Sequence, residues 1–186
     1  GTINVDVKKI GCDFLAFPGF KWICGPPGIG IFYCKKESAS LLTPKYIGGE
    51  SAIITDEKNL VYSESPQKFQ TGFRNYLGIA GLASSLKYIQ RLGVNEIRKM
   101  NMKVANQIIE EIRTIPGISI FGPKDEKLRS SIVSFAIDSV SPKVMVSRIE
   151  KNGIIVAERD IVGEGKKKAV RASPHFFNNE EEIMKT

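Results

Sequence analysis

The most informative stretch of the sequence runs from residue 17 to residue 30 and reads FPGFKWICGPPGIG. Its second half, GPPGIG, has the glycine spacing of a phosphate-binding loop. That loop needs Lys and then Ser or Thr next, whereas Ile31 and Phe32 follow here. We therefore reject a nucleoside triphosphatase. We expect the glycines to form a tight connection between two strands, where a positive φ or close backbone approach excludes a side chain.

Lys21 is unusual in this stretch because apolar residues surround it, namely Phe17, Phe20, Trp22 and Ile23. Such a run should be buried on at least one face. A buried lysine tends to lose its proton, and the free amine is what a Schiff-base nucleophile needs. On the residues alone, the favoured interpretation is a strand lysine whose ammonium reaches solvent. The Schiff-base lysine is the alternative.

The hydrophobic pattern along the chain predicts an α/β fold without internal repeats. Residues 41–70 are expected to form a long irregular connection. Apolar stripes predict two successive helices. The first carries Leu77, Ala80, Ala83 and Leu86, with Ile79, Leu82 and Ile89 broadening its stripe, and the second carries Ile97, Val104, Ile108 and Ile112. Two further helices are expected, one capped by Ser141 with Pro142 at its first position and one capped by Asn178 or Asn179. Expected strands cover residues 3–7, 13–22, 29–33, 118–121, 131–137, 154–157 and 169–172.

Composition and charge narrow the function classes. The formal net charge is +7, but the basic residues are scattered along the chain. Only Lys166–Lys168 form a run, and we expect this run to lie in a solvated loop. We therefore expect no nucleic-acid partner. Neither a membrane span nor a signal pattern is evident, which predicts a cytoplasmic protein. Cys12, Cys24 and Cys34 lack metal-ligand spacing, so we expect reduced thiols in a buried sheet and no metal site.

Several motifs, taken in order, carry a resemblance to a known family. They are Cys12-Asp13-Phe14, Lys21-Trp22, Gly25-Pro26-x-Gly28-x-Gly30, Gly48-Gly49, Thr71-Gly72-Phe73-Arg74-Asn75, Val170-Arg171-Ala172-Ser173-Pro174-His175, Phe177-Asn178 and Glu181-Glu182-Ile183. The ordered set resembles the class V aminotransferase and cysteine desulfurase family of fold-type I enzymes, which use pyridoxal 5'-phosphate (PLP). The element at residues 71–75 is similar to the form found in isopenicillin-N-epimerase-like members.

This resemblance implies the domain organisation. Residues 1–72 would be the end of the large PLP-binding domain, and residues 73–186 a small carboxy-terminal domain with a mostly antiparallel sheet. The chain would be the carboxy-terminal half of a longer protein, with the family's pyridine-nitrogen aspartate and ring-stacking residue upstream. A homodimer is implied as well.

The resemblance also implies roles for individual residues. Lys21 would bind PLP covalently and move the proton of the substrate's Cα. Arg171 would grip the substrate carboxylate with both sides of its guanidinium, although the residue alone could equally be a surface arginine. Thr71 and Gly72 would lie near the cofactor phosphate, across a dimer interface. His175 comes too late in the chain to be the ring-stacking histidine and is interpreted as structural.

The sequence departs from the family at three positions that usually serve the phosphate, where it has Pro18, Phe20 and Phe73. The implied reaction is PLP chemistry on an amino acid, with transamination between amino-acid and keto-acid substrates as the main hypothesis. The alternatives are a cysteine desulfurase or lyase, an epimerase, and a non-catalytic dimerisation module. A persulfide-forming desulfurase needs a mobile cysteine in the expected loop at residues 158–168, which contains none.

Overall fold

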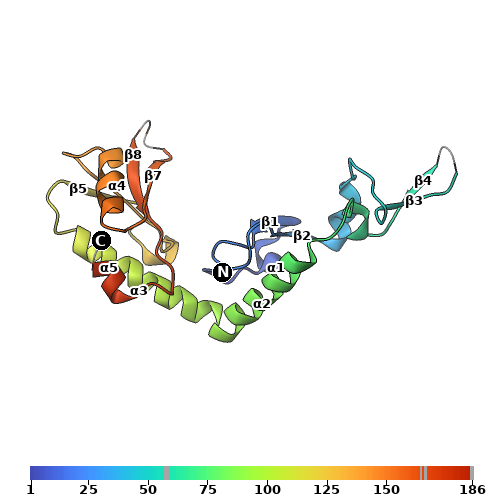
Figure 1. The fold of residues 1–186 in the computed structure, drawn as a ribbon, viewed down its shortest axis with the longest axis horizontal. Helices are drawn as coiled ribbons and strands as arrows, with labels where there is room; N and C mark the ends of the chain where they lie inside the picture. The colour runs from blue at the N-terminus through green and yellow to red at the C-terminus, as the bar shows by residue number, and fades with distance from the viewer. Residues whose placement is uncertain (57–58, 164, 166, 185–186) are drawn as a thin grey trace. The chain divides into compact units, whose positions relative to one another are not determined.

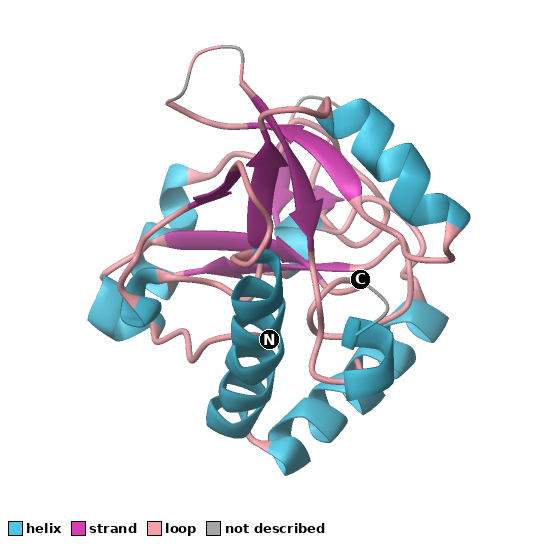
Figure 2. Cartoon of the chain, turned by 90° about the vertical axis from the view of Figure 1, so that its left-hand side faces the viewer, coloured by secondary structure: helices cyan, strands magenta, loops and turns pink. Residues whose placement is uncertain are grey.

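The computed structural model describes residues 1–56, 59–163, 165 and 167–184. By their contacts the residues form two compact units (Figure 1). The first unit is Asn4–Arg91, and the second is Leu92–Thr186 together with Gly1–Ile3. Both contain helices and strands (Figure 2), which confirms the expected α/β class. The predicted domain boundary at residue 72 stays a prediction.

The first unit is built on two antiparallel hairpins. Strands β1 (Phe14–Pro18) and β2 (Gly30–Cys34) form the first hairpin, and β3 (Ala52–Ile54) and β4 (Leu60–Tyr62) form the second. The remaining elements are α1 (Val7–Ile10), the short 3-10 helices η1 (Lys36–Leu41) and η2 (Gln67–Phe69), and α2 (Tyr76–Leu92).

Three expectations for the first unit were wrong. Residues 3–7 form no strand, because Asp6 accepts the backbone N–H groups of Lys8 and Lys9 and starts α1, which ends at Gly11 with φ +73°. Residues 41–70 are not irregular throughout, since they contain β3, β4 and η2. The strand expected at residues 13–22 ends at Pro18, so Lys21 lies in a loop.

The second unit is an antiparallel sheet with helices packed on one face. Its strands are β5 (Ile118–Phe121), β6 (Val133–Ile137), β7 (Ala157–Asp160) and β8 (Lys168–Ala172), in the spatial order β5-β6-β8-β7 with every neighbouring pair antiparallel. The helices are α3 (Val94–Ile112), η3 (Glu126–Leu128), α4 (Pro142–Lys151) and α5 (Glu180–Met184). The sheet confirms the predicted antiparallel arrangement, but β7 begins where the strand expected at residues 154–157 was to end.

The core of the second unit lies between the sheet and its helices. Side chains from α3, α4, β6, β8 and α5 form one buried cluster, including Val104, Ile108 and Ile112 as expected from the periodicity of α3. Ser141 accepts the N–H of Val144 and caps α4, with Pro142 at the first position, as predicted. Asn179 accepts the N–H of Glu182 at the start of α5 and is therefore the cap of that helix.

Helix α2 forms where predicted but buries only part of its expected apolar stripe. Leu82 and Ile89 are buried, whereas Leu77 is 89% exposed and Ala80 and Ala83 are exposed too. The apolar stripe read from the sequence is therefore largely open to solvent in this chain. Of the described residues, no helix combines the length and the apolar character that crossing a membrane requires.

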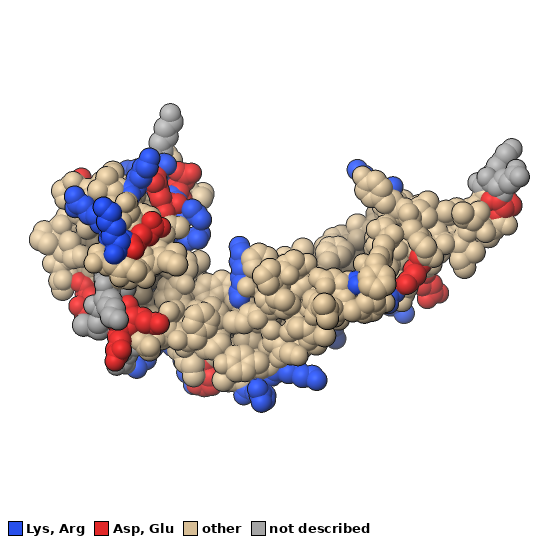
Figure 3. Space-filling model, in the orientation of Figure 1, with Lys and Arg blue, Asp and Glu red and all other residues tan. Residues whose placement is uncertain are grey.

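Charge is distributed over both units. On the face shown in Figure 3, basic and acidic side chains of the described residues are interspersed. Within the Lys166–Lys168 run, Lys166 lies outside the described residues, and Lys168 begins β8 instead of lying in a loop. Its ammonium pairs with Glu158 at 2.5 Å, and this hydrogen bond raises the pKa of Lys168.

Candidate functional site

Lys21 lies on a short closed loop between β1 and β2. The N–H of Gly25 donates to the carbonyl of Gly19 at 2.9 Å, which joins the two ends of the loop. Inside it, the N–H of Cys24 donates to the carbonyl of Lys21 at 2.9 Å. These two hydrogen bonds restrain the backbone of the loop around Lys21, although the residue lies outside regular secondary structure.

The glycines at the ends of this loop are required by close packing. A Cβ on Gly25 would lie 2.7 Å from the carbonyl oxygen of Gly19, closer than real Cβ atoms approach. A Cβ on Gly19 would lie 2.9 Å from Cδ1 of Leu82 in helix α2. This confirms the expected close backbone approach at Gly25, and it shows that the loop is packed against α2.

Helix α2 supports the lysine loop through two further contacts. Oγ of Ser85 donates to the carbonyl of Cys24 at 2.9 Å, while Leu82 is buried beneath Gly19 and Gly25. A Cβ on Gly81 would lie 2.9 Å from Cγ of Pro26, so the helix is also in close contact with the proline ring that directly follows the loop. Sequence reasoning missed these supporting residues. The small residues Gly81 and Ser85 on one face of a helix were the available signal.

The side chain of Lys21 is exposed, contrary to the burial expected from its apolar neighbours. Ile23 is buried and Phe17 and Trp22 are half-buried, but Phe20 is 47% exposed. The loop places the apolar residues on either side of Lys21 in environments that differ in exposure. Their hydrophobicity in the sequence therefore overestimated the burial of the Lys21 side chain. Among the described residues, no carboxylate or hydrogen-bond acceptor engages the ammonium of Lys21, which leaves it available to a ligand.

A second group of candidate residues gathers where the segment at residues 48–51 meets the segment at residues 71–74. A Cβ on Gly48 would lie 1.9 Å from the carbonyl oxygen of Thr71, so only glycine permits this approach. Ser51 is fully buried, and its Oγ accepts the N–H of Gly48 at 2.7 Å. Arg74 forms an ion pair with Glu50. The structure thus joins the Gly48-Gly49 motif to the element that contains Thr71 and Gly72.

Thr71 and Gly72 are exposed, and their backbone N–H groups and the Thr71 hydroxyl have no hydrogen-bond partner among the described residues. Exposed N–H groups and a hydroxyl next to each other are suitable donors for phosphate oxygens. Arg74, from the same element, is already paired with Glu50, so the neutral donors carry this argument. These residues fit a phosphate group. The donors of Thr71 and Gly72 could replace the phosphate donors that the family usually has at the positions of Pro18, Phe20 and Phe73. The Phe73 side chain is 94% exposed.

Arg171 lies in β8, on the sheet face opposite the helices. Its neighbours Val170 and Ala172 point into the core, and side chains alternate along a strand. Directly opposite Arg171 on the adjacent strands lie the small residues Ser134 and Ala157. The half-buried guanidinium has a buried Nε without a hydrogen-bond partner among the described residues. An unsatisfied donor at a strand position flanked by small side chains fits the binding of a carboxylate.

The surroundings of His175 fit the structural role expected from the sequence, which stays a prediction. The residue is buried, and its ring stacks on Phe177 with ring centroids 4.4 Å apart. Nδ1 of His175 accepts the N–H of Phe176 at 3.1 Å, and the backbone N–H of His175 donates to Asn178 at 2.8 Å. These contacts fix the turn between β8 and α5.

The three cysteines are free thiols, but they are not all in a buried sheet as expected. Cys12 and Cys34 are half-buried, and Cys24 is exposed in the lysine loop. Partial burial of its thiol raises the pKa of Cys24, which reduces the thiolate fraction at neutral pH. The loop in which a desulfurase cysteine was sought was expected to span residues 158–168. It is shorter, because residues 158–160 belong to β7 and Lys168 belongs to β8.

The predicted site residues are divided between the two units. Lys21, Thr71 and Gly72 belong to the first unit and Arg171 belongs to the second. Among the described residues, no hydrogen bond joins Lys21 to Thr71 or Gly72. The roles predicted for these residues therefore remain predictions.

Comparisons with known proteins identify the family. A family model described as aminotransferase class-V matches residues 1–185. A probable cysteine desulfurase of Methanothermobacter thermautotrophicus is 33% identical over 99% of this chain and 48% of its own length. One of Pyrococcus abyssi is 34% identical over 98% of this chain and 47% of its own length. The chain thus spans about half the length of the curated relatives it matches.

Solved structures show the same fold. The apo structure of a cysteine desulfurase from Thermococcus onnurineus NA1 has a TM-score of 0.92 and 30% identity, covering 98% of this chain and 47% of its own. A K223A mutant of C-DES with glycine covalently linked to its PLP cofactor has a TM-score of 0.81 at 23% identity. That likeness concerns the fold alone, and its coverage is 98% of this chain and 46% of the other. Taken with the family match over residues 1–185, these findings confirm the predicted resemblance: the chain belongs to the class V aminotransferase family of PLP-dependent proteins.

Proposed function

We propose that this chain is the lysine-bearing part of a cytoplasmic PLP-dependent enzyme that acts on the carbon–sulfur bond of cysteine or a closely related amino acid. The observation that carries the proposal is the closed lysine loop of a class V family member, which presents Lys21 with an exposed and unpaired ammonium. The relatives named as probable cysteine desulfurases favour sulfur chemistry over the transamination expected from the sequence.

When bound, PLP supplies an electron-accepting ring that stabilises negative charge at the substrate's Cα. Nζ of Lys21 would hold the cofactor and later receive and return the Cα proton, because an amine on a fixed backbone can alternate between the two tasks. The packing of Gly19 and Gly25 on Leu82 would keep this amine in one place. A fixed base matters because a misplacement of about 1 Å can reduce a rate by about a hundredfold.

The other residues would bind and orient. Thr71 and Gly72 would donate hydrogen bonds to the phosphate, which is consistent with their unpaired N–H groups. Arg171 would bind the substrate carboxylate through its guanidinium, whose Nε lacks a partner among the described residues. Charge-assisted hydrogen bonds of this kind contribute about 1.5–3 kcal/mol each.

We further propose that the full-length protein is a homodimer, with Thr71 and Gly72 supplied to the site of the second subunit. Exposed apolar residues on the β3–β4 hairpin, Ile53, Ile54 and Val61, support an interface there. A monomer by light scattering at micromolar concentration would contradict this part of the proposal.

Transamination remains a second candidate, as does epimerisation, because residues 158–168 contain no cysteine to accept sulfur. Product analysis with the full-length protein, PLP and cysteine separates the reactions. Alanine with sulfur transferred to a thiol indicates a desulfurase, and pyruvate with ammonia and sulfide indicates a lyase. Conversion of an added keto acid to its amino acid indicates an aminotransferase, whereas interconversion of enantiomers indicates an epimerase. If PLP at saturation gives neither a visible absorbance band nor turnover, the protein is a non-catalytic dimerisation module and the proposal is wrong.

A further inference from the structure

A cavity lined by several cations lies in the second unit, away from the residues assigned above. Its volume is about 720 Å³, within the usual range for pockets that bind small molecules. It lies at one end of the sheet, where β5 and β7 end and β6 and β8 begin, next to the carboxy-terminal end of α3. Lys21, Thr71, Gly72 and Arg171 do not line it.

The wall of this cavity carries an excess of positive charge. Its basic residues are Arg113, Lys124, Arg129 and Arg159, and Asp160 is its only acidic residue among those described. In the described part of the chain, Arg113 and Lys124 have no carboxylate within ion-pair distance. Cations that are not neutralised around a concave surface repel one another, and a bound anion relieves this repulsion.

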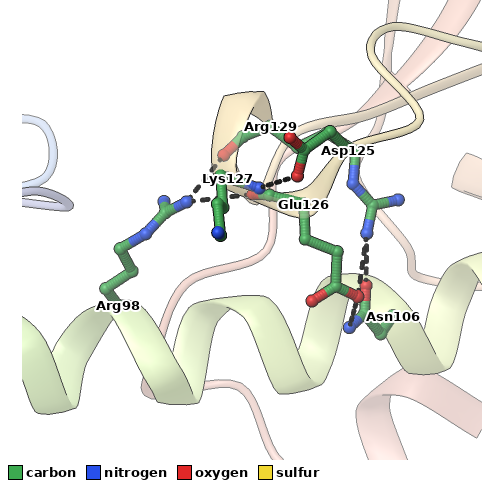
Figure 4. Close-up of polar contacts among 6 residues, drawn as sticks. All are labelled: Arg98, Asn106, Asp125, Glu126, Lys127 and Arg129. Atoms are coloured by element: carbon green, nitrogen blue, oxygen red, sulfur yellow. Dashed lines mark hydrogen bonds and ion pairs between the residues drawn. The ribbon is translucent and has the colours of Figure 1, made fainter.

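Arg129 is the most fixed of these cations, and its side chain is 15% exposed. Its Nη2 donates to Oδ1 of Asn106 at 2.7 Å and lies 3.3 Å from Oε1 of Glu126 (Figure 4). The Nε of Arg129 is buried without a partner among the described residues. One donor of an otherwise anchored guanidinium therefore remains available.

The loop that carries Arg129 is itself anchored to α3. Nη2 of Arg98 donates to the carbonyls of Glu126 and Arg129, at 3.1 Å each, and Asp125 caps η3 by accepting the N–H of Lys127 (Figure 4). These bonds hold the wall of the cavity in place before any ligand arrives. A preformed wall lowers the entropic cost of binding.

Apolar side chains form the rest of the cavity. Ile109 comes from α3, Ile120 and Phe121 from β5, and Ile132 and Val133 from the start of β6. A fully hydrated inorganic ion would leave these side chains in contact with water. A ligand with an apolar body and an anionic group would engage both kinds of wall.

We propose that this cavity binds a small organic phosphate, with the phosphate among the arginines and Lys124 and an apolar or aromatic body against Ile120, Phe121 and Val133. Phosphate is favoured because the planar guanidinium matches its oxygens and because three arginines line the cavity. The concave shape favours a small molecule over a nucleic acid or an acidic protein. The inference does not rest on the proposed PLP chemistry.

The test uses the full-length protein saturated with PLP, so that the cofactor phosphate site is occupied, and phenyl phosphate as the probe. Isothermal titration should show that phenyl phosphate binds more tightly than inorganic phosphate or phenol, with an affinity that falls as salt rises. The double variant Arg113→Gln/Lys124→Gln should bind phenyl phosphate at least about tenfold more weakly, since each charge-assisted contact contributes a factor of about ten or more.

The matched control is Lys143→Gln/Lys151→Gln, which removes the same charge from exposed positions on α4 outside the cavity. This control should bind phenyl phosphate as the wild type does. The PLP absorbance of every variant should be unchanged, which distinguishes this site from the cofactor site. No detectable binding to the wild type would overturn the proposal. Equal weakening in both double variants, or binding of a nucleic acid or acidic peptide that excludes the probe, would overturn it as well.

Discussion

The contact between Gly48 and Thr71 offers a sharp test of the proposed phosphate-binding element. In Gly48→Ala the new Cβ would lie 1.9 Å from the carbonyl oxygen of Thr71. A carbon–oxygen contact is normally about 3.3 Å or longer, so the two segments would have to separate by roughly 1.4 Å. The clash is with backbone, which cannot move away by a change of rotamer.

Two effects of this displacement can be estimated. Overpacking a fixed contact should lower the free energy of unfolding by about 1–3 kcal/mol. If Thr71 and Gly72 donate to the cofactor phosphate, loss of one such hydrogen bond should weaken PLP binding roughly tenfold to a hundredfold. Urea unfolding and spectrophotometric PLP titration of the full-length apo-protein measure the two effects separately.

The adjacent glycine is a matched control, because a Cβ on Gly49 would meet no atom within 4 Å. Gly49→Ala should retain wild-type unfolding free energy and PLP affinity. Wild-type PLP affinity in Gly48→Ala, despite measurable destabilisation, would refute the assignment of Thr71 and Gly72 to the phosphate. Equal PLP losses in the two variants would refute the packing argument.

Three further predictions concern the full-length protein. Arg171→Lys keeps the positive charge but loses the planar guanidinium that can bind both carboxylate oxygens. The value of kcat/KM should therefore fall by a factor equivalent to about 1.5–3 kcal/mol. An unchanged kcat/KM would mean that Arg171 is merely structural. Gly25→Ala places a Cβ 2.7 Å from the Gly19 carbonyl oxygen and should cost about 1–3 kcal/mol of unfolding free energy, whereas wild-type stability by urea unfolding would argue against the closed lysine loop. Single Ser replacements of Cys12, Cys24 and Cys34 should each leave sulfide release from cysteine intact, while abolition by any one would reveal a persulfide route.

The helices were predictable where local chemistry and packing agree. The stripe of α3 is regular over five turns and faces the buried sheet, and Ser141 with Pro142 determines the start of α4 whatever the surroundings. In α2, by contrast, the apolar stripe through Leu77 is exposed, because periodicity identifies a helix but does not say which face has a partner. The hairpin of β3 and β4 was missed because its strands have three residues each, too few to show alternation.

For the candidate site, the sequence identified residues by resemblance but not their environments. Lys21 was expected in a buried strand, whereas β1 ends at Pro18 and the closed loop leaves the lysine exposed. The packing of Gly48 on Thr71 joins segments more than 20 residues apart. No local pattern encodes such a contact. The excess of cations around the cavity of the second unit likewise comes from residues spread over several elements.

The central claim is that Lys21 is the residue that binds PLP, and its most direct test is chemical labelling. The full-length protein, its Lys21→Ala variant and this 186-residue chain would each be treated with PLP and borohydride and analysed by peptide mapping. We predict selective labelling of the Lys21 peptide in the full-length protein and no label at that position in the variant. The 186-residue chain alone, in which Lys21 is exposed, should show only scattered labelling of surface lysines. Labelling of the full-length protein at another lysine, with Lys21 unmodified, would contradict the account.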